Sequence, residues 1–126
     1  MDEFSRKSNE ISFTVNVLIK KEDSMFVAHC LELDIVAVHH TVEDVQKEIA
    51  SLISAQIDYA FSNDNTDNLY HPAPIEIWHE FYTCKEQVER KYQIRSEYGK
   101  ESGKEKIIPP WLITKTCSPE ENPCYA

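Results

Sequence analysis

The chain has 126 residues, of which 41% are hydrophobic and 28% charged, as expected for one globular domain. No window approaches the roughly eighteen uninterrupted apolar residues of a membrane span, and the first ten residues contain no apolar targeting segment, so we expect a cytoplasmic protein with four reduced cysteines. The net charge of -9 makes direct nucleic-acid binding unfavourable.

Three strands are predicted first. Residues 11–19 alternate apolar and polar side chains, and the polar run KKEDS that follows them predicts a hairpin loop. A second strand, MFVAHCLEL, has apolar residues on both faces, and the short third strand, IVAVHH, is rich in β-branched residues. The pattern therefore predicts a three-stranded antiparallel meander.

A long amphipathic helix follows the third strand. Thr41 is a good N-cap, and Glu43 and Asp44 fall in the first turn, where carboxylates interact favourably with the helix dipole. Apolar residues recur at helical spacing over about five turns and predict the stripe that packs on the sheet. This stripe comprises Val42, Val45, Ile49, Leu52, Ile53, Ile57 and Ala60. We expect the run SNDNTDN to end the helix and PIEIWHEFY, residues 74–82, to form a fourth strand.

The remaining segment is less regular. Residues 84–106 mix both signs of charge and fit a helix through Val88 and Tyr92 or a strand through Tyr92, Ile94 and Ser96. We favour an exposed helix or an irregular arm. The apolar segment IIPPWLITKTC begins at residue 107, and its two prolines favour an extended backbone. This segment either packs on its own domain or docks on a second subunit. We thus predict an α+β fold with a βββαβ order, composed of a tail at 1–10, a domain at 11–83 and a charged segment with an apolar arm at 84–126.

The segment SMFVAHCLELDIVAVHHTVEDV, within residues 11–57, resembles the HicB antitoxin family. The shared pattern is an aromatic-containing strand that ends in Cys and EL, a short strand, a capping Thr, an acidic pair and an amphipathic helix. The resemblance implies a truncated RNase H-like fold and a non-catalytic role. His40 stands where the family usually has glycine, and no DNA-binding segment is legible after the core.

Two catalytic alternatives were considered. RNase H-type catalysis needs several carboxylates around two metal ions, one of them from the first strand, and residues 11–19 contain no acid. A small metal site or enzyme would use His29, Cys30, His39 and Asp34. His39 and His40 are adjacent on a strand and point to opposite faces, which disfavours their binding one ion. We therefore predict no enzyme and no cofactor, and leave the metal-binding protein as an alternative.

The acidic body favours a protein partner. Residues 1–84 contain five Lys or Arg against fifteen Asp or Glu, so a small basic, toxin-like protein is the natural candidate. A HicB-like domain of another function is the further alternative. We also expect a homodimer, because the second face of the sheet would be apolar and uncovered, with Phe26, Ala28, Cys30, Val36, Val38 and Trp78 on it. The candidate partner-binding residues are Glu32, Asp34, Glu43, Asp44, Trp78 and Trp111.

Overall fold

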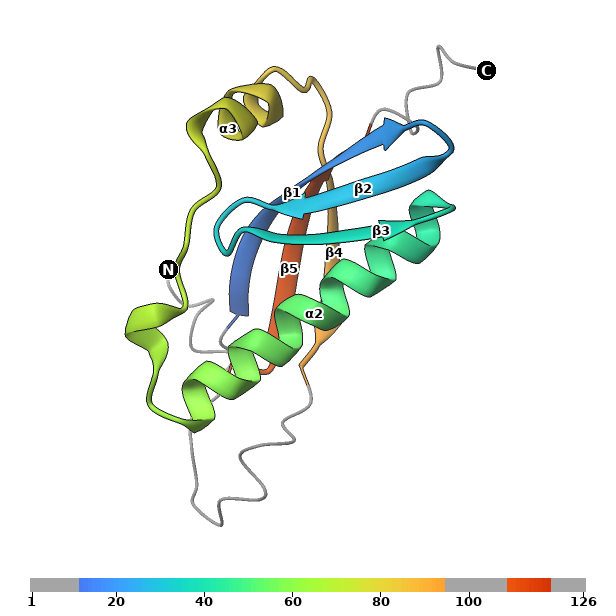
Figure 1. Cartoon of the computed structure of the whole chain (residues 1–126). Helices are drawn as coiled ribbons and strands as arrows, with labels where there is room; N and C mark the ends of the chain where they lie inside the picture. The colour runs from blue at the N-terminus through green and yellow to red at the C-terminus, as the bar shows by residue number, and fades with distance from the viewer. Residues whose placement is uncertain (1–11, 95–108, 119–126) are drawn as a thin grey trace, which may run out of the picture.

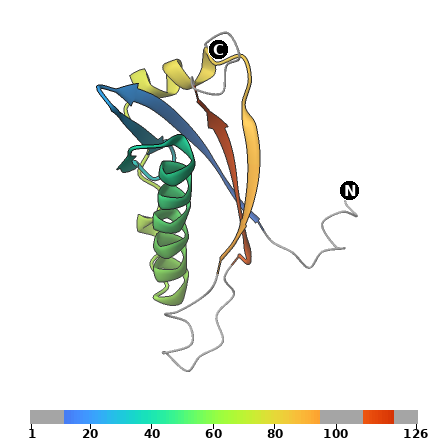
Figure 2. The same ribbon diagram turned by 90° about the vertical axis from the view of Figure 1, so that its right-hand side faces the viewer.

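The computed structural model describes residues 12–94 and 109–118 and has the predicted α+β class. One sheet of five strands, in the order β3-β2-β1-β5-β4, is covered on one face by a long helix, α2 (Figures 1 and 2). The strands are β1 (Ser12–Glu22), β2 (Met25–Cys30), β3 (Ile35–His39), β4 (Val88–Gln93) and β5 (Trp111–Cys117). The helices are α2 (Val42–Ser62), the short 3-10 helix η1 (Thr66–Asn68) and α3 (Ile75–Tyr82).

The predicted three-stranded meander is confirmed. Strand β2 pairs antiparallel with β1 on one side, with Val17 opposite Cys30, and antiparallel with β3 on the other, with Ala28 opposite Ala37. Both turns contain an aspartate with a positive φ, Asp23 at 58° and Asp34 at 57°. Aspartate tolerates this left-handed conformation better than most residues, which explains why two turns without glycine can close the meander.

Two further strands complete the sheet and correct the prediction for the C-terminal segment. Residues 88–93 form strand β4, not an exposed helix or an irregular arm, because alternate side chains from Val88 to Tyr92 face the same side as α2. Strand β5 lies between β1 and β4, parallel to β1 and antiparallel to β4. The apolar arm is therefore an interior strand of its own sheet from Trp111 onward.

The main core lies between the sheet and α2, and the predicted helix face is confirmed. Thr41 caps α2, because its Oγ1 accepts a hydrogen bond of 3.0 Å from the backbone N–H of Asp44. The sheet supplies buried side chains from four strands and from the β2–β3 turn. Ile94, just after β4, adds another buried side chain. Buried core residues include Val15, Val17, Ile19, Ala28, Cys30, Leu33, Ala37, Val45, Ile49, Ile53, Ile57, Ile94 and Leu112.

The predicted fourth strand at residues 74–82 is wrong, because Ile75–Tyr82 forms helix α3 with Pro74 at its N-cap. Proline's fixed φ suits a helix start, and Ile77, Trp78 and Phe81 recur at helical spacing on one side. These side chains pack against the sheet face opposite α2. They belong to a second cluster that includes Leu18, Leu31, Ala73, Phe81 and Cys117.

Helix α3 also corrects the prediction of an uncovered second face. Ala28 and Cys30 are fully buried under α2, and Phe26 packs against the same core, so these three residues lie on the helix side. Val36 and Val38 do project from the opposite face, where each is 48% exposed. The second face is therefore partly covered by α3, and Val36 and Val38 are the large apolar side chains of the described strands that stay exposed on it.

Cysteine usage differs from the prediction of four reduced thiols. Cys84, just after α3, forms a disulfide with Cys117 at the end of β5, with a Cα–Cα distance of 6.1 Å. The bond joins two segments that meet only in the folded sheet, so the spacing of the cysteines in the sequence could not indicate it.

Among helices in the described ranges, 12–94 and 109–118, none is long and apolar enough to span a bilayer.

Candidate protein-binding edge of the sheet

Strand β3 forms one edge of the sheet. Within the described residues it pairs with β2 alone, and α2 begins three residues after its end. Val36 and Val38 stand on the face away from α2, opposite His29 and Val27 of β2 respectively. An edge strand presents unpaired backbone donors and acceptors, so this exposed apolar strand is a candidate surface for strand addition.

A rigid acidic turn precedes this edge. Glu32 lies in the β2–β3 turn, and its two carboxylate oxygens accept hydrogen bonds from Asn16, at 2.8 Å from the backbone N–H and 2.6 Å from the side-chain amide. The backbone N–H groups of His71 and Ala73 donate to the carbonyls of Glu32 and Leu31, at 2.9 and 2.7 Å. The turn is therefore tied both to β1 and to the segment before α3.

Burial changes the chemistry of Glu32. Desolvation raises the pKa of its carboxyl group above the ordinary value of 4.5, although the hydrogen bonds from Asn16 act in the opposite direction. Since both oxygens are used by Asn16, this carboxylate stabilises the turn and is a poor candidate for direct contact with a partner. It differs in this respect from the other predicted acidic residues.

Asp34 closes the same turn and is more exposed. Its carboxylate lies 2.5 Å from Nε2 of His29, and the exposed fractions of the two side chains are 45% and 19%. The pair lies at the start of β3, on the face that carries Val36. A carboxylate fixed in this way presents negative charge at one end of the edge strand.

The other end of β3 leads into the first turns of α2. His39 faces α2 and lies 3.6 Å from Glu48, while Glu43 lies 3.8 Å from Lys47 on the exposed side of the helix. Asp44 is also exposed, beside the cap formed by Thr41. Carboxylates therefore flank β3 at both ends.

The six predicted partner-binding residues do not form one cluster. Asp34 lies at one end of β3, and Glu43 and Asp44 lie just beyond the other end. Trp78 is half-buried on α3 and packs on the second cluster, with its ring 6.1 Å from that of Tyr82. Trp111 lies on β5, where Nζ of Lys91 is 4.4 Å from its ring centroid.

The four residues of the alternative metal site are also separated. His29 and Asp34 meet on the face opposite α2, whereas Cys30 and His39 point toward the helix side. Burial raises the pKa of the Cys30 thiol to about 12, so it is protonated at neutral pH and is a poor ligand or nucleophile. In the part of the chain that the structure describes, no three His, Cys, Asp or Glu residues are grouped to hold a metal ion.

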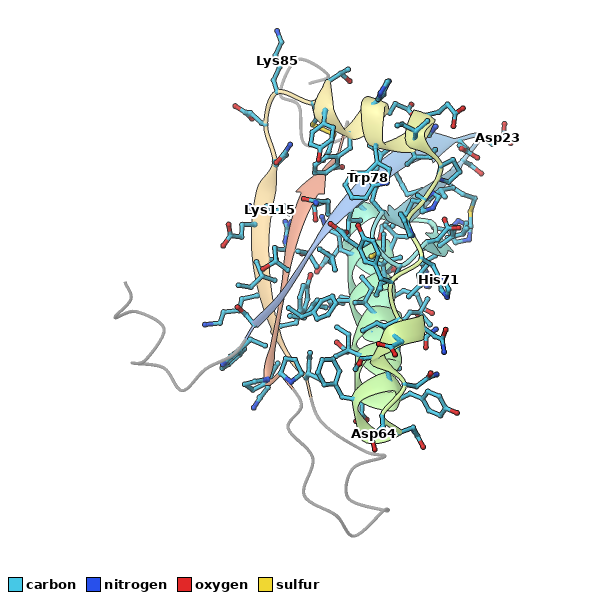
Figure 3. The ribbon with its side chains drawn as sticks, turned by 90° about the vertical axis from the view of Figure 1, so that its left-hand side faces the viewer. Asp23, Asp64, His71, Trp78, Lys85 and Lys115 are labelled. Atoms are coloured by element: carbon cyan, nitrogen blue, oxygen red, sulfur yellow. A yellow bond between two sulfur atoms is a disulfide. The ribbon has the colours of Figure 1, made fainter. Side chains whose placement is uncertain are left out.

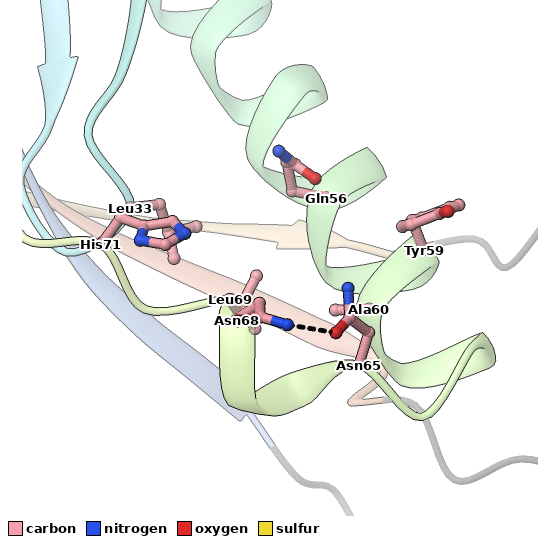
Figure 4. Close-up of a pocket in the computed structure, with 8 residues that line it drawn as sticks. All are labelled: Leu33, Gln56, Tyr59, Ala60, Asn65, Asn68, Leu69 and His71. Carbon is pink, nitrogen blue, oxygen red and sulfur yellow. Dashed lines mark hydrogen bonds between the residues drawn. The ribbon is translucent and has the colours of Figure 1, made fainter.

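Sequence reasoning missed a cavity of about 230 Å³ beside the C-terminal half of α2 (Figure 4). Its polar lining includes Asn68, whose amide donates to Oδ1 of Asn65 at 2.7 Å. The eight lining residues are Leu33, Gln56, Tyr59, Ala60, Asn65, Asn68, Leu69 and His71. The polar run SNDNTDN was a signal for this site, but it indicated only the end of the helix. The lining of the cavity contains no Asp, Glu, Lys or Arg.

Sequence reasoning also passed over Glu48. The helical pattern places Glu48 on the polar side of α2, yet only the fold shows that this side borders β3.

Comparison with models of known protein families, with curated proteins and with solved structures finds no match for this chain. The assignment of a function therefore depends on the residues and geometry described above.

Proposed function

We propose that the chain is a non-catalytic interaction domain of the HicB-like antitoxin type, which self-associates and binds a small basic protein on its acidic side. The observation that carries this proposal is the separation of charge across the molecule. Lys47 is the only Lys or Arg between residues 22 and 84, a stretch that contains twelve Asp and Glu. Ten of these carboxylates are exposed, namely Glu22, Asp23, Asp34, Glu43, Asp44, Glu48, Asp64, Asp67, Glu76 and Glu80.

Most other basic side chains of the described residues lie on β4 and β5 or next to them, although Lys20 and Lys21 stand at the end of β1, where Lys20 lies 3.3 Å from Glu80. Figure 3 shows Lys85 and Lys115 on the side of β4 and β5, and Asp23, Asp64 and His71 on the opposite side. Such a separation attracts a cationic partner toward one side of the molecule and speeds the encounter at low ionic strength. It also supports binding of a protein in preference to a phosphate backbone at the α2 and β3 side.

The carboxylates around β3 form the centre of the acidic side, and their arrangement fits this role. Asp34, Glu43 and Glu48 surround β3, where they are held by the β2–β3 turn and the rigid first turns of α2. Glu32 stabilises the turn from inside. Trp111 belongs to the basic side through its contact with Lys91, so we do not include it in the proposed partner surface.

The test first looks for a short, basic open reading frame beside the gene of this chain, whose absence would contradict the proposal, and then uses its product. We expect the two proteins, when co-expressed, to elute as one complex in size-exclusion chromatography and to separate at high salt. The substitutions Glu43→Lys and Glu48→Lys, made together, should weaken the complex by about tenfold or more, because two attractive charges become repulsive.

Glu89→Lys is the matched control. Glu89 is exposed on β4, at the opposite edge of the sheet, so the same change of charge there should leave binding unchanged. Circular dichroism of each variant verifies the fold. A complex that forms equally well with the Glu43→Lys/Glu48→Lys protein, or the absence of any complex with the neighbouring basic protein, would contradict the proposal.

A further inference from the structure

The two edges of the sheet are not equivalent. Strand β4 has the sequence VERKYQ, and three consecutive charged residues protect that edge from pairing with another chain. Strand β3 has the sequence IVAVH, which contains no Lys, Arg, Asp, Glu or Pro. Of the two edge strands, only β3 lacks the charges and prolines by which proteins prevent edge-to-edge association.

We infer that β3 pairs antiparallel with β3 of a second copy of the chain, about a two-fold axis at Ala37. This inference deepens the self-association in the proposed function by naming its surface, and it does not depend on the basic partner. The pairing would join two five-stranded sheets into one continuous sheet, with both α2 helices on the same face. Backbone groups at the β3 edge would then find partners in the second copy.

The register of this pairing follows from the symmetry. With Ala37 on the axis, Val36 of one copy lies opposite Val38 of the other, and opposite residues of an antiparallel pair share a face. Val36 and Val38 are each 48% exposed and lie on the face away from α2. The pairing would therefore bring four exposed valines together and remove apolar surface from water.

The valines alone select this register. A shift of one residue would turn the valines of one copy to the opposite face from those of the other, so that the four side chains no longer meet. Asp34 and His40 lie outside β3, and the Asp34 carboxylate is already 2.5 Å from Nε2 of His29 within its own copy.

The association also explains how separate acidic residues could act together. In one copy, Asp34 and the pair Glu43 and Asp44 lie at opposite ends of β3. In the paired arrangement, Asp34 of one copy lies at the end of the joined strands from which α2 of the second copy begins. Each end of the paired strands would then carry carboxylates from both copies.

The test measures the mass of the purified full chain by sedimentation over a range of concentrations, with no partner present. We expect a dimer for the parent chain. Val38→Lys should raise the dimer dissociation constant by about a hundredfold or more, because it puts two like charges into the paired strands. The control Glu89→Lys, on the protected β4 edge, should leave the dimer unchanged.

A charge exchange at the valines tests the register. Val36→Lys and Val38→Glu should each weaken the dimer, and the double variant should recover it in part, because position 36 of one copy lies opposite position 38 of the other and the introduced charges attract. Val36→Lys replaces Val38→Lys if the latter does not fold. A parent chain that is monomeric at every concentration overturns the inference, as does a dimer that survives both valine substitutions. Either result leaves the partner-binding test unaffected, since that test follows a complex with a different protein.

Discussion

At the scale of single residues, carboxylates that are close together in the sequence have different structural roles. The carboxylate of Glu32 accepts hydrogen bonds from Asn16, sixteen residues earlier in the chain, whereas Asp34 and Glu43 stay exposed. The sequence indicated an acidic group near the third strand, but it could not show which carboxylate is enclosed. That distinction depends on how β1 lies beside the β2–β3 turn.

Glu32 offers a test of this assignment. Glu32→Ala should lower the free energy of unfolding by about 1–3 kcal/mol, because the half-buried N–H of Asn16 loses its acceptor. Glu32→Gln keeps an acceptor of the same shape and should cost less. Urea denaturation at neutral pH compares the two variants, and equal losses would contradict the assigned role.

The raised pKa adds a pH dependence to the same comparison. Burial raises the pKa of the Glu32 carboxyl group in the folded chain, so the folded state binds more protons than the unfolded state as the pH rises above 4.5. The free energy of unfolding of the parent should therefore fall relative to Glu32→Gln as the pH rises through the raised pKa. If the free energy of unfolding of the parent instead rose relative to that of Glu32→Gln over this pH range, the raised pKa of Glu32 would be contradicted.

At the scale of elements, the parts determined by local pattern were predicted well. The meander and α2 have strong periodicity, a clear cap and an apolar stripe, and the structure confirms them. The segment PIEIWHEFY satisfies both a strand period and a helix period, and packing on the second cluster selects the helix. Strands β4 and β5 were missed because each gains its stability from neighbours distant in the sequence.

The packing of α2 can be tested at Ile49, which is 2% exposed. Ile49→Asp should leave the chain largely unfolded, because a buried unpaired charge costs several kcal/mol, on the order of the whole stability of a domain. Ser51→Asp is the control, since Ser51 is exposed on the same helix. A circular dichroism melt should separate the two variants, and an unchanged melt for Ile49→Asp would refute the packing.

The disulfide that fastens α3 to β5 gives a second test at this scale. Cys84 and Cys117 are 33 residues apart, and closing a loop of that length stabilises the fold by about 3–4 kcal/mol in the chain-entropy model. The Cys84→Ser/Cys117→Ser variant should lose about this much in urea denaturation and should not respond further to a dithiol reductant. Peptide mapping without reductant should recover the linked cysteines; their absence would contradict the pairing.

At the scale of the whole molecule, the sheet unites segments that the sequence assigned to separate regions. The boundary predicted at residues 83 and 84 stays a prediction, yet β5 from beyond it pairs with β1 from Ser12 to Leu18. Leu112, Thr114 and Thr116 of β5 are buried under α2. Long-range pairing of this kind leaves little trace in local composition, which explains why the apolar arm was not predicted as an interior strand.

Deletion of residues 107–126 tests whether the meander and α2 fold without β5. We expect the truncated chain to be unfolded or aggregated, because β1 loses its parallel neighbour, β4 loses the one strand that it pairs with among the described residues, and the disulfide to Cys84 is removed. Deletion of residues 119–126 is the control, since it keeps every described strand. Circular dichroism and thermal melting measure the outcome. A cooperative melt of the longer truncation would show that residues 1–106 fold without β5, which would then be an addition to a stable domain and not part of its core.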